Sequence, residues 1–143
     1  DGMLAVFGAP VSKGPEVDAC DAVRAALEIQ EQISNLNEEL ALEDQPPFRM
    51  RIGVHSGAVL TGSLGSSKRL EYAVIGDTVN CASRLESLDK QSHLEMVRVL
   101  VSEETLSLLE TLPDDITSED WGTINVKGRQ KPLNVIELRS TAP

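Results

Sequence analysis

Residues 69–87 read RLEYAVIGDTVNCASRLES, and this stretch decides the fold. Residues 70–75 predict a strand, a Gly-Asp pair interrupts it, and residues 77–88 predict a helix. Asn80 and Arg84 are four residues apart, so both side chains leave the same face of that helix. A carboxamide and a guanidinium on one rigid face suit an anionic, oxygen-rich ligand such as a nucleotide phosphate.

Helical patterns occur on both sides of this stretch. Residues 22–40 place apolar side chains in steps of three and four, which predicts a long helix with one apolar face. Ser102 is a suitable N-cap for a helix over 103–110, which has acidic residues in its first turn. Asp77 and Thr78 are predicted to cap the helix that they begin, in preference to a direct catalytic role. The apolar face of the long helix is predicted to be Ala22, Ala26, Ile29, Ile33, Leu36 and Leu40.

The remaining apolar runs predict strands, including a buried one near the start of the chain. Residues 113–120 are expected to form an acidic loop, and Arg129 and Lys131 are expected on the surface of a later turn. Strands alternating with helices and ending in a hairpin predict the α/β or α+β class. The expected strands are residues 3–7, 48–55, 58–64, 98–102 and a final pair, 121–126 with 133–138.

Composition limits the classes of protein that fit. A chain of 143 residues, 41% hydrophobic but only 3% aromatic, predicts a single domain with an aliphatic core. The net charge of −10 argues against general nucleic-acid binding, which needs a basic surface. Cys20 and Cys81 lie in predicted helices without metal-binding spacing, which favours buried, reduced thiols in a cytosolic protein.

Residues 69–87 closely resemble the class III nucleotide cyclases, the adenylate and guanylate cyclases. The resemblance implies that Asn80 orients the ribose and that Arg84 stabilises charge on the α-phosphate. Residues 1–10, DGMLAVFGAP, are similar to the second metal-binding motif of the family. On that match Asp1 is a metal ligand, and its carboxylate suits Mg²⁺ or Mn²⁺ carrying a triphosphate. The implied site uses two such ions.

Two further motifs match in the family order. Residues 50–57, MRIGVHSG, resemble the strand in which the equivalent of Arg51 contacts the triphosphate; the alternative is an exposed Arg at a sheet edge. His55 is read as a structural histidine that bonds the backbone in preference to a general base. Residues 124–129, INVKGR, resemble the family hairpin whose lysine binds the β- and γ-phosphates, which assigns Lys127.

The resemblance implies a ferredoxin-like cyclase fold with a central, mostly antiparallel sheet and helices on one face. It also implies attack of the ribose 3′-hydroxyl on the α-phosphate of ATP or GTP, with pyrophosphate leaving. The site would lie between two identical chains. Asp1 and Arg51 of one chain would face four residues of the other, namely Ala73, Asn80, Arg84 and Lys127.

The match departs from the family in two places. The first strand and helix, the first metal motif and a residue that helps read the purine precede Asp1 in the family. We therefore expect residues 1–143 to be one cyclase domain without its N-terminal part, cut from a longer protein and inactive alone. Ala73 replaces a side chain that hydrogen-bonds the purine, so the choice between ATP and GTP is open.

Two rival interpretations remain. The first is a cyclase-like domain that binds a nucleotide or a regulatory partner without catalysis, and the second is an unrelated α/β interaction domain with chance motifs. We expect a cytoplasmic domain in a signalling protein with an upstream regulatory domain. Whether the parent protein is anchored in a membrane is open, and no run in this chain approaches the length of a membrane span.

Overall fold

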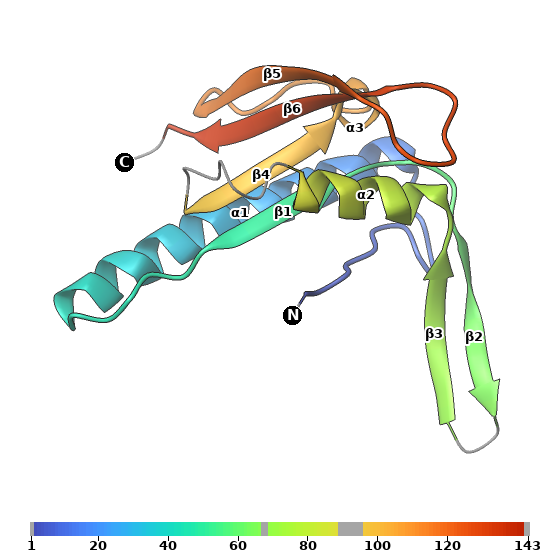
Figure 1. The fold of residues 1–143 in the computed structure, drawn as a ribbon, viewed down its shortest axis with the longest axis horizontal. Coiled ribbons are helices and arrows are strands. Elements are labelled where there is room, and N and C mark those ends of the chain that lie inside the picture. The colour runs from blue at the N-terminus through green and yellow to red at the C-terminus, as the bar shows by residue number, and fades with distance from the viewer. Residues whose placement is uncertain (1, 67–68, 89–95, 142–143) are drawn as a thin grey trace.

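A four-stranded sheet forms the centre of the fold (Figure 1). In order across the sheet, its strands are β1 (Met50–Val54), β4 (Val97–Ser102), β6 (Leu133–Ser140) and β5 (Ile116–Ile124). β1 and β4 are parallel, whereas β4–β6 and β5–β6 are antiparallel. This computed structural model describes residues 2–66, 69–88 and 96–141. The predicted α/β class and the mostly antiparallel sheet are confirmed.

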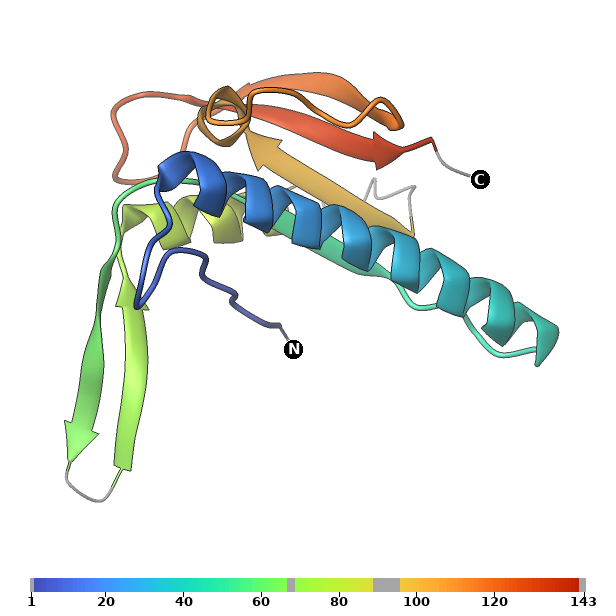
Figure 2. The same cartoon turned by 180° about the vertical axis from the view of Figure 1, so that it is seen from behind.

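Helices α1 (Pro15–Leu42) and α2 (Asp77–Ser87) pack on opposite faces of this sheet (Figures 1 and 2). β4 is buried along its whole length, and its side chains alternate between the two faces. Val99 and Val101 join the apolar cluster under α1, whereas Leu100 joins the cluster under α2. The expectation of helices on one face is therefore wrong, because a strand buried on both sides needs a cover on each.

The buried face of α1 is rotated relative to the predicted stripe. Ala19, Val23 and Ala26 are buried against the sheet, whereas Ile29, which belongs to the predicted stripe, is 41% exposed. Figures 1 and 2 show the C-terminal end of α1 extending beyond the sheet. Gln30 lies where the sheet ends: its Nε2 donates to Val97 O at 3.0 Å and its Oε1 accepts from a backbone N–H of β6 at 3.1 Å.

Strands β2 (Leu60–Ser66) and β3 (Arg69–Ile75) form a separate antiparallel hairpin. The hairpin projects away from the main sheet and meets the body at the start of α2 (Figures 1 and 2). Its register places Ala73 opposite Gly62. The predicted pair of strands is confirmed, and residues 67 and 68 of the connecting turn lie outside the described residues.

The predicted strand over residues 3–7 does not form. This segment is extended, but it has no assigned strand among the described residues, and Met3 is 95% exposed. A short apolar run becomes a strand only where a neighbour accepts its backbone hydrogen bonds, and the described part of the chain supplies none to this run.

The C-terminal half differs from expectation at two boundaries. β5 begins at Ile116, inside the predicted acidic loop, because it pairs with β6 over its whole length. Arg139 on β6 forms an ion pair with Glu119 at 3.1 Å and with Glu137, which allows two carboxylates to face each other across the strands. α3 (Glu103–Ser107) ends earlier than predicted, but Ser102 is its N-cap as expected, accepting from Thr105 N–H at 3.3 Å.

Both cysteines are free thiols, with Cys81 buried and Cys20 half-buried. Among the helices that the structure describes, none combines the length and the apolar character needed to cross a membrane.

Candidate active site

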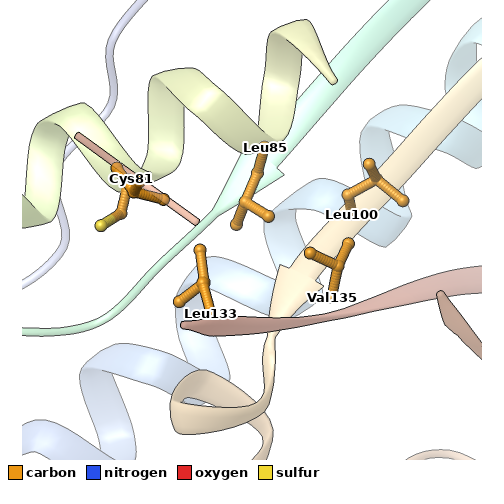
Figure 3. Close-up of a cluster of buried hydrophobic side chains, with 6 residues drawn as sticks. Cys81, Leu85, Leu100, Leu133 and Val135 are labelled. Atoms are coloured by element: carbon orange, nitrogen blue, oxygen red, sulfur yellow. The ribbon is translucent and has the colours of Figure 1, made fainter. Parts of the chain in front are cut away.

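Helix α2 turns its apolar side chains to the sheet and its predicted site residues to solvent. Cys81 and Leu85 are fully buried in the cluster with Leu100, Leu133 and Val135 (Figure 3). The two predicted site residues each precede one of these buried residues, about 100° around the helix. They are Asn80 and Arg84, and both are exposed. The common face predicted for them is thus accessible to a ligand, and their roles stay predictions.

The start of α2 is fixed by backbone geometry and by one side chain. Gly76, the residue before the helix, has φ +153°, a conformation that side-chain-bearing residues rarely adopt. Thr78 Oγ1 donates to Ala58 O at 2.8 Å, which ties the first turn to the segment after β1. No side chain caps the helix, so the predicted capping roles of Asp77 and Thr78 are wrong. Asp77 still complements the helix dipole in the first turn.

Gly53 allows α2 to lie directly on β1. A Cβ at this position would lie 2.3 Å from Ala82 O and 2.5 Å from Glu86 N, both backbone atoms of α2. Only glycine permits this approach. Gly53, within the motif at residues 50–57, therefore sets the distance between α2 and β1, and with it the position of Asn80 and Arg84.

The end of α2 is held by a buried arginine that the sequence interpretation missed. Arg98 on β4 is 2% exposed, and its guanidinium donates to the carbonyl oxygens of Glu86 at 3.2 Å and of Leu88. It also lies over the ring of Trp121, 5.4 Å from the ring centroid. These carbonyls have no partner within the helix, and a cation at a helix C-terminus is favourable. A charged residue inside the run VRVLVS was the available signal.

Arg51 is paired within its own chain. Its Nε donates to Glu86 Oε1 at 3.0 Å, and the two side chains are 30% and 39% exposed. The guanidinium is thus neither a free edge residue nor buried. A phosphate bound to Arg51 would have to compete with the Glu86 carboxylate, and the predicted triphosphate contact stays a prediction.

Lys127 lies exposed in the loop between β5 and β6. The preceding Val126 is 7% exposed and packs in the cluster with Cys81 and Leu85. Arg129 N–H donates to Val126 O at 3.1 Å and closes a turn, in which Gly128 takes φ +85°. Lys127 is therefore presented to solvent from a turn whose first residue is anchored beneath α2.

Arg129 is not the turn-surface residue that the sequence predicted. Its side chain is 17% exposed, and Nη2 forms an ion pair with Glu104 Oε1 at 2.5 Å. Nη1 lies 3.2 Å from His55 Nε2 and 3.6 Å from Cys81 Sγ. The local sequence gave no signal of this, because the three partners come from distant positions. Lys131, expected at the surface of the same turn, is exposed.

His55 bonds side chains and not the backbone. Its Nδ1 lies 2.7 Å from Ser102 Oγ, and its Nε2 faces Arg129. Burial lowers the pKa of His55 below its ordinary value, and the nearby Arg129 lowers it further, while Glu104 and Asp77 raise it. Because the Arg129 guanidinium can only donate, its contact with Nε2 fits a neutral imidazole that donates from Nδ1, and a structural role stays a prediction.

The structure places the predicted site residues in three different ways. Asn80, Arg84 and Lys127 belong to elements that pack on one another through the cluster in Figure 3. Ala73 lies on β3, which leads directly into α2. Asp1, the predicted metal ligand, lies outside the described residues.

The described residues do not by themselves provide a metal site. Within residues 2–66, 69–88 and 96–141, no group of three His, Cys, Asp or Glu side chains is arranged to hold a metal ion. We therefore assign no described residue to a metal site.

Comparison with known proteins identifies the family. Residues 1–137 match the model of the adenylate and guanylate cyclase catalytic domain. The chain belongs to this family. Cyclases of this family generally use divalent metal ions. Among similar solved structures, the adenylyl cyclase CyaB from P. aeruginosa is 30% identical with a TM-score of 0.76, over 95% of this chain and 66% of that one. The guanylyl cyclase Cya2 is 28% identical with a TM-score of 0.71, over 95% and 64%.

Relatives with curated names include cyclases of both kinds. Adenylate cyclase 1 of Rhizobium meliloti is 33% identical over 96% of this chain, and guanylate cyclase 32E of Drosophila melanogaster is 33% identical over 90%. This cyclase domain spans 20% of the length of the first and 10% of the second. It is thus similar to a small part of longer proteins.

Proposed function

We propose that this domain is the catalytic part of a purine nucleotide cyclase that converts ATP or GTP to the 3′,5′-cyclic nucleotide and pyrophosphate. The observation that carries the proposal is the exposed face of α2, on which Asn80 and Arg84 stand side by side near the Lys127 loop. Family membership supports it.

In the proposed mechanism each residue has one task. The Asn80 carboxamide hydrogen-bonds the ribose and directs its 3′-hydroxyl toward the α-phosphate. The Arg84 guanidinium meets the negative charge that develops on the α-phosphate during attack. Lys127 binds the β- and γ-phosphates and stabilises pyrophosphate as it leaves. Because α2 is fixed at both ends, Asn80 and Arg84 are preorganised before the nucleotide binds.

We further propose that the site is completed by a second copy of the chain. The partner's Asp1 and Arg51 would face Ala73, Asn80, Arg84 and Lys127, and a two-fold axis would generate two identical sites. Mg²⁺ or Mn²⁺, two per site, would be bound from the side that carries Asp1. The proposed setting is a cytoplasmic catalytic domain beside a regulatory domain in a longer signalling protein.

The base choice of this proposed cyclase depends on position 73. An alanine side chain offers no hydrogen bond to either purine, and a pocket without a matching polar group discriminates weakly. We therefore expect both ATP and GTP to be converted, with rates that differ less than in cyclases that have a polar residue here.

The test is product formation by the protein at its natural length, given ATP or GTP with Mn²⁺. Cyclic nucleotide should form and should be lost in the Asn80→Ala variant, while Lys131→Ala, which removes an exposed charge from the Lys127 loop, should retain activity. Mixing two inactive variants, Asp1→Asn and Arg84→Ala, should restore about a quarter of the activity, since one of the two sites in half of the dimers is then intact.

A catalytically inactive nucleotide-binding domain is the second candidate. The ion pair between Arg51 and Glu86 favours it, because that pair withdraws a guanidinium from the proposed phosphate contacts. Nucleotide binding without cyclic product, in a folded dimer at its natural length, would select this candidate.

A further inference from the structure

The Lys127 turn is held at two points, and only one of them is apolar. Val126 enters the core under α2, while the guanidinium of Arg129 enters a polar cluster beside the first turns of α2. The exposed lysine lies between these two anchors. The position of Lys127 relative to Asn80 therefore depends on both anchors. The polar anchor in turn depends on the partners of Arg129.

Arg129 links three elements that are far apart in the sequence. It contacts Glu104 on α3, His55 after the end of β1, and Cys81 on α2. Cys81 directly follows Asn80 and points in turn to Asp77 Oδ2, 3.9 Å from its sulfur. A single guanidinium with donors in a rigid fork can bridge such a set of acceptors, whereas an ammonium group is a compact point charge on a flexible stem.

The bond between Arg129 and His55 specifies the state of the histidine. Arginine only donates, so Nε2 of His55 accepts and its Nδ1–H donates to Ser102 Oγ at 2.7 Å. Ser102 Oγ also accepts from Thr105 N–H and caps α3, the helix that carries Glu104. The hydrogen bond to Ser102 therefore orients the His55 ring that accepts from Arg129.

We infer that Arg129 is a positioning residue that fixes the position of the Lys127 turn relative to α2. The proposed phosphate-binding lysine and the Asn80–Arg84 face can then act on one ligand. The inference rests on the proposed function for the identity of that ligand. Arg129 itself is turned inward and does not contact the nucleotide: its two terminal nitrogens are occupied by His55, Cys81 and Glu104.

The test measures nucleotide affinity and not turnover. The probes are 3′-deoxy-ATP and 3′-deoxy-GTP, which lack the attacking hydroxyl and cannot be cyclised, bound to the natural-length protein with Mn²⁺ and followed by calorimetry. The variants are Lys127→Ala, Arg129→Met, Arg129→Lys and the double variant Lys127→Ala/Arg129→Met. Lys131→Met is the matched control, since it removes an exposed cation from the same loop. Amide hydrogen exchange at 125–132 and across α2 reports on folding.

We expect Arg129→Met to weaken binding about tenfold, as Lys127→Ala does, and to speed exchange in the turn but not in α2. Arg129→Lys should also bind the nucleotide weakly, because lysine keeps the positive charge but lacks the planar, forked donors of the guanidinium. In the double variant the loss should stay within about twofold of Lys127→Ala alone, since Arg129 acts through that lysine. Multiplying losses, or affinity unchanged in Arg129→Met, would overturn the inference. If the two substitutions are coupled in nucleotide binding but the wild type forms no cyclic product, the inference stands and the proposed cyclase activity is rejected. Absence of nucleotide binding by the wild type would reject both.

Discussion

Replacing Gly53 by alanine should displace the helix that carries the proposed catalytic pair. The new Cβ would lie 2.3 Å from Ala82 O, whereas ordinary contacts begin at 3.4 Å. The obstructing atoms belong to helix backbone and cannot rotate away, so α2 must retreat by about 1 Å, the difference between the two distances. Overpacking of this kind costs about 1–3 kcal/mol, and a 1 Å misplacement near a reaction centre can cost about a hundredfold in rate.

The assay for this variant is amide hydrogen exchange over residues 77–87, together with cyclic nucleotide production, in the natural-length protein. Exchange should accelerate about fivefold to 150-fold, corresponding to the lost free energy. Gly62→Ala is the matched control, because its Cβ would meet no atom within 4 Å. Equal exchange in the two variants would refute the claim that Gly53 sets the distance between α2 and β1.

Three further changes test the supports of α2 and its surroundings. Arg98→Met should free the last turn of α2 and cost about 2 kcal/mol, since it removes charged hydrogen bonds to partly buried carbonyls; unchanged exchange at residues 84–88 would contradict this. Thr78→Val should cost about 1 kcal/mol by removing the bond to Ala58 O, read as faster exchange in the first turn, and an unaltered rate there would show that the bond is dispensable. Because the pKa of His55 is lowered on folding, the unfolded chain binds the extra proton more readily, so stability should decline as pH falls below about 6.5. Melting temperatures measured from pH 8 to 5 should show this decline in the wild type and less of it in His55→Gln; identical profiles would remove His55 as its source.

The elements that follow local periodicity were predictable from the sequence. The strand, Gly-Asp break and helix over residues 69–87 appear as β3 and α2, and Ser102 caps α3 as its position before two glutamates indicated. The class of fold followed from the order of these elements. Side-chain exposure on α2 also followed, since the helical period separates Asn80 and Arg84 from the buried Cys81 and Leu85.

The features that failed depend on contacts between distant residues. The isolated segment at residues 3–7 had the composition of a strand but no described neighbour, and β5 began early because β6 pairs with it through the acidic stretch. Arg129 reads as a turn residue in its local context, and only the tertiary arrangement gives it its three partners. The register of the sheet and the partners of Arg129 are set by residues that are distant in the sequence, so a local pattern does not predict them.

The most direct test of the central claim is the kcat of Arg84→Ala in the natural-length protein with ATP and GTP. The guanidinium is proposed to meet charge that exists only in the transition state, so kcat should fall about 100- to 1,000-fold while KM changes little. Asn80 and the rest of α2 should remain protected from exchange in the variant, because Arg84 is exposed. Cyclic nucleotide formed at the wild-type rate, or a loss confined to KM, would contradict the account.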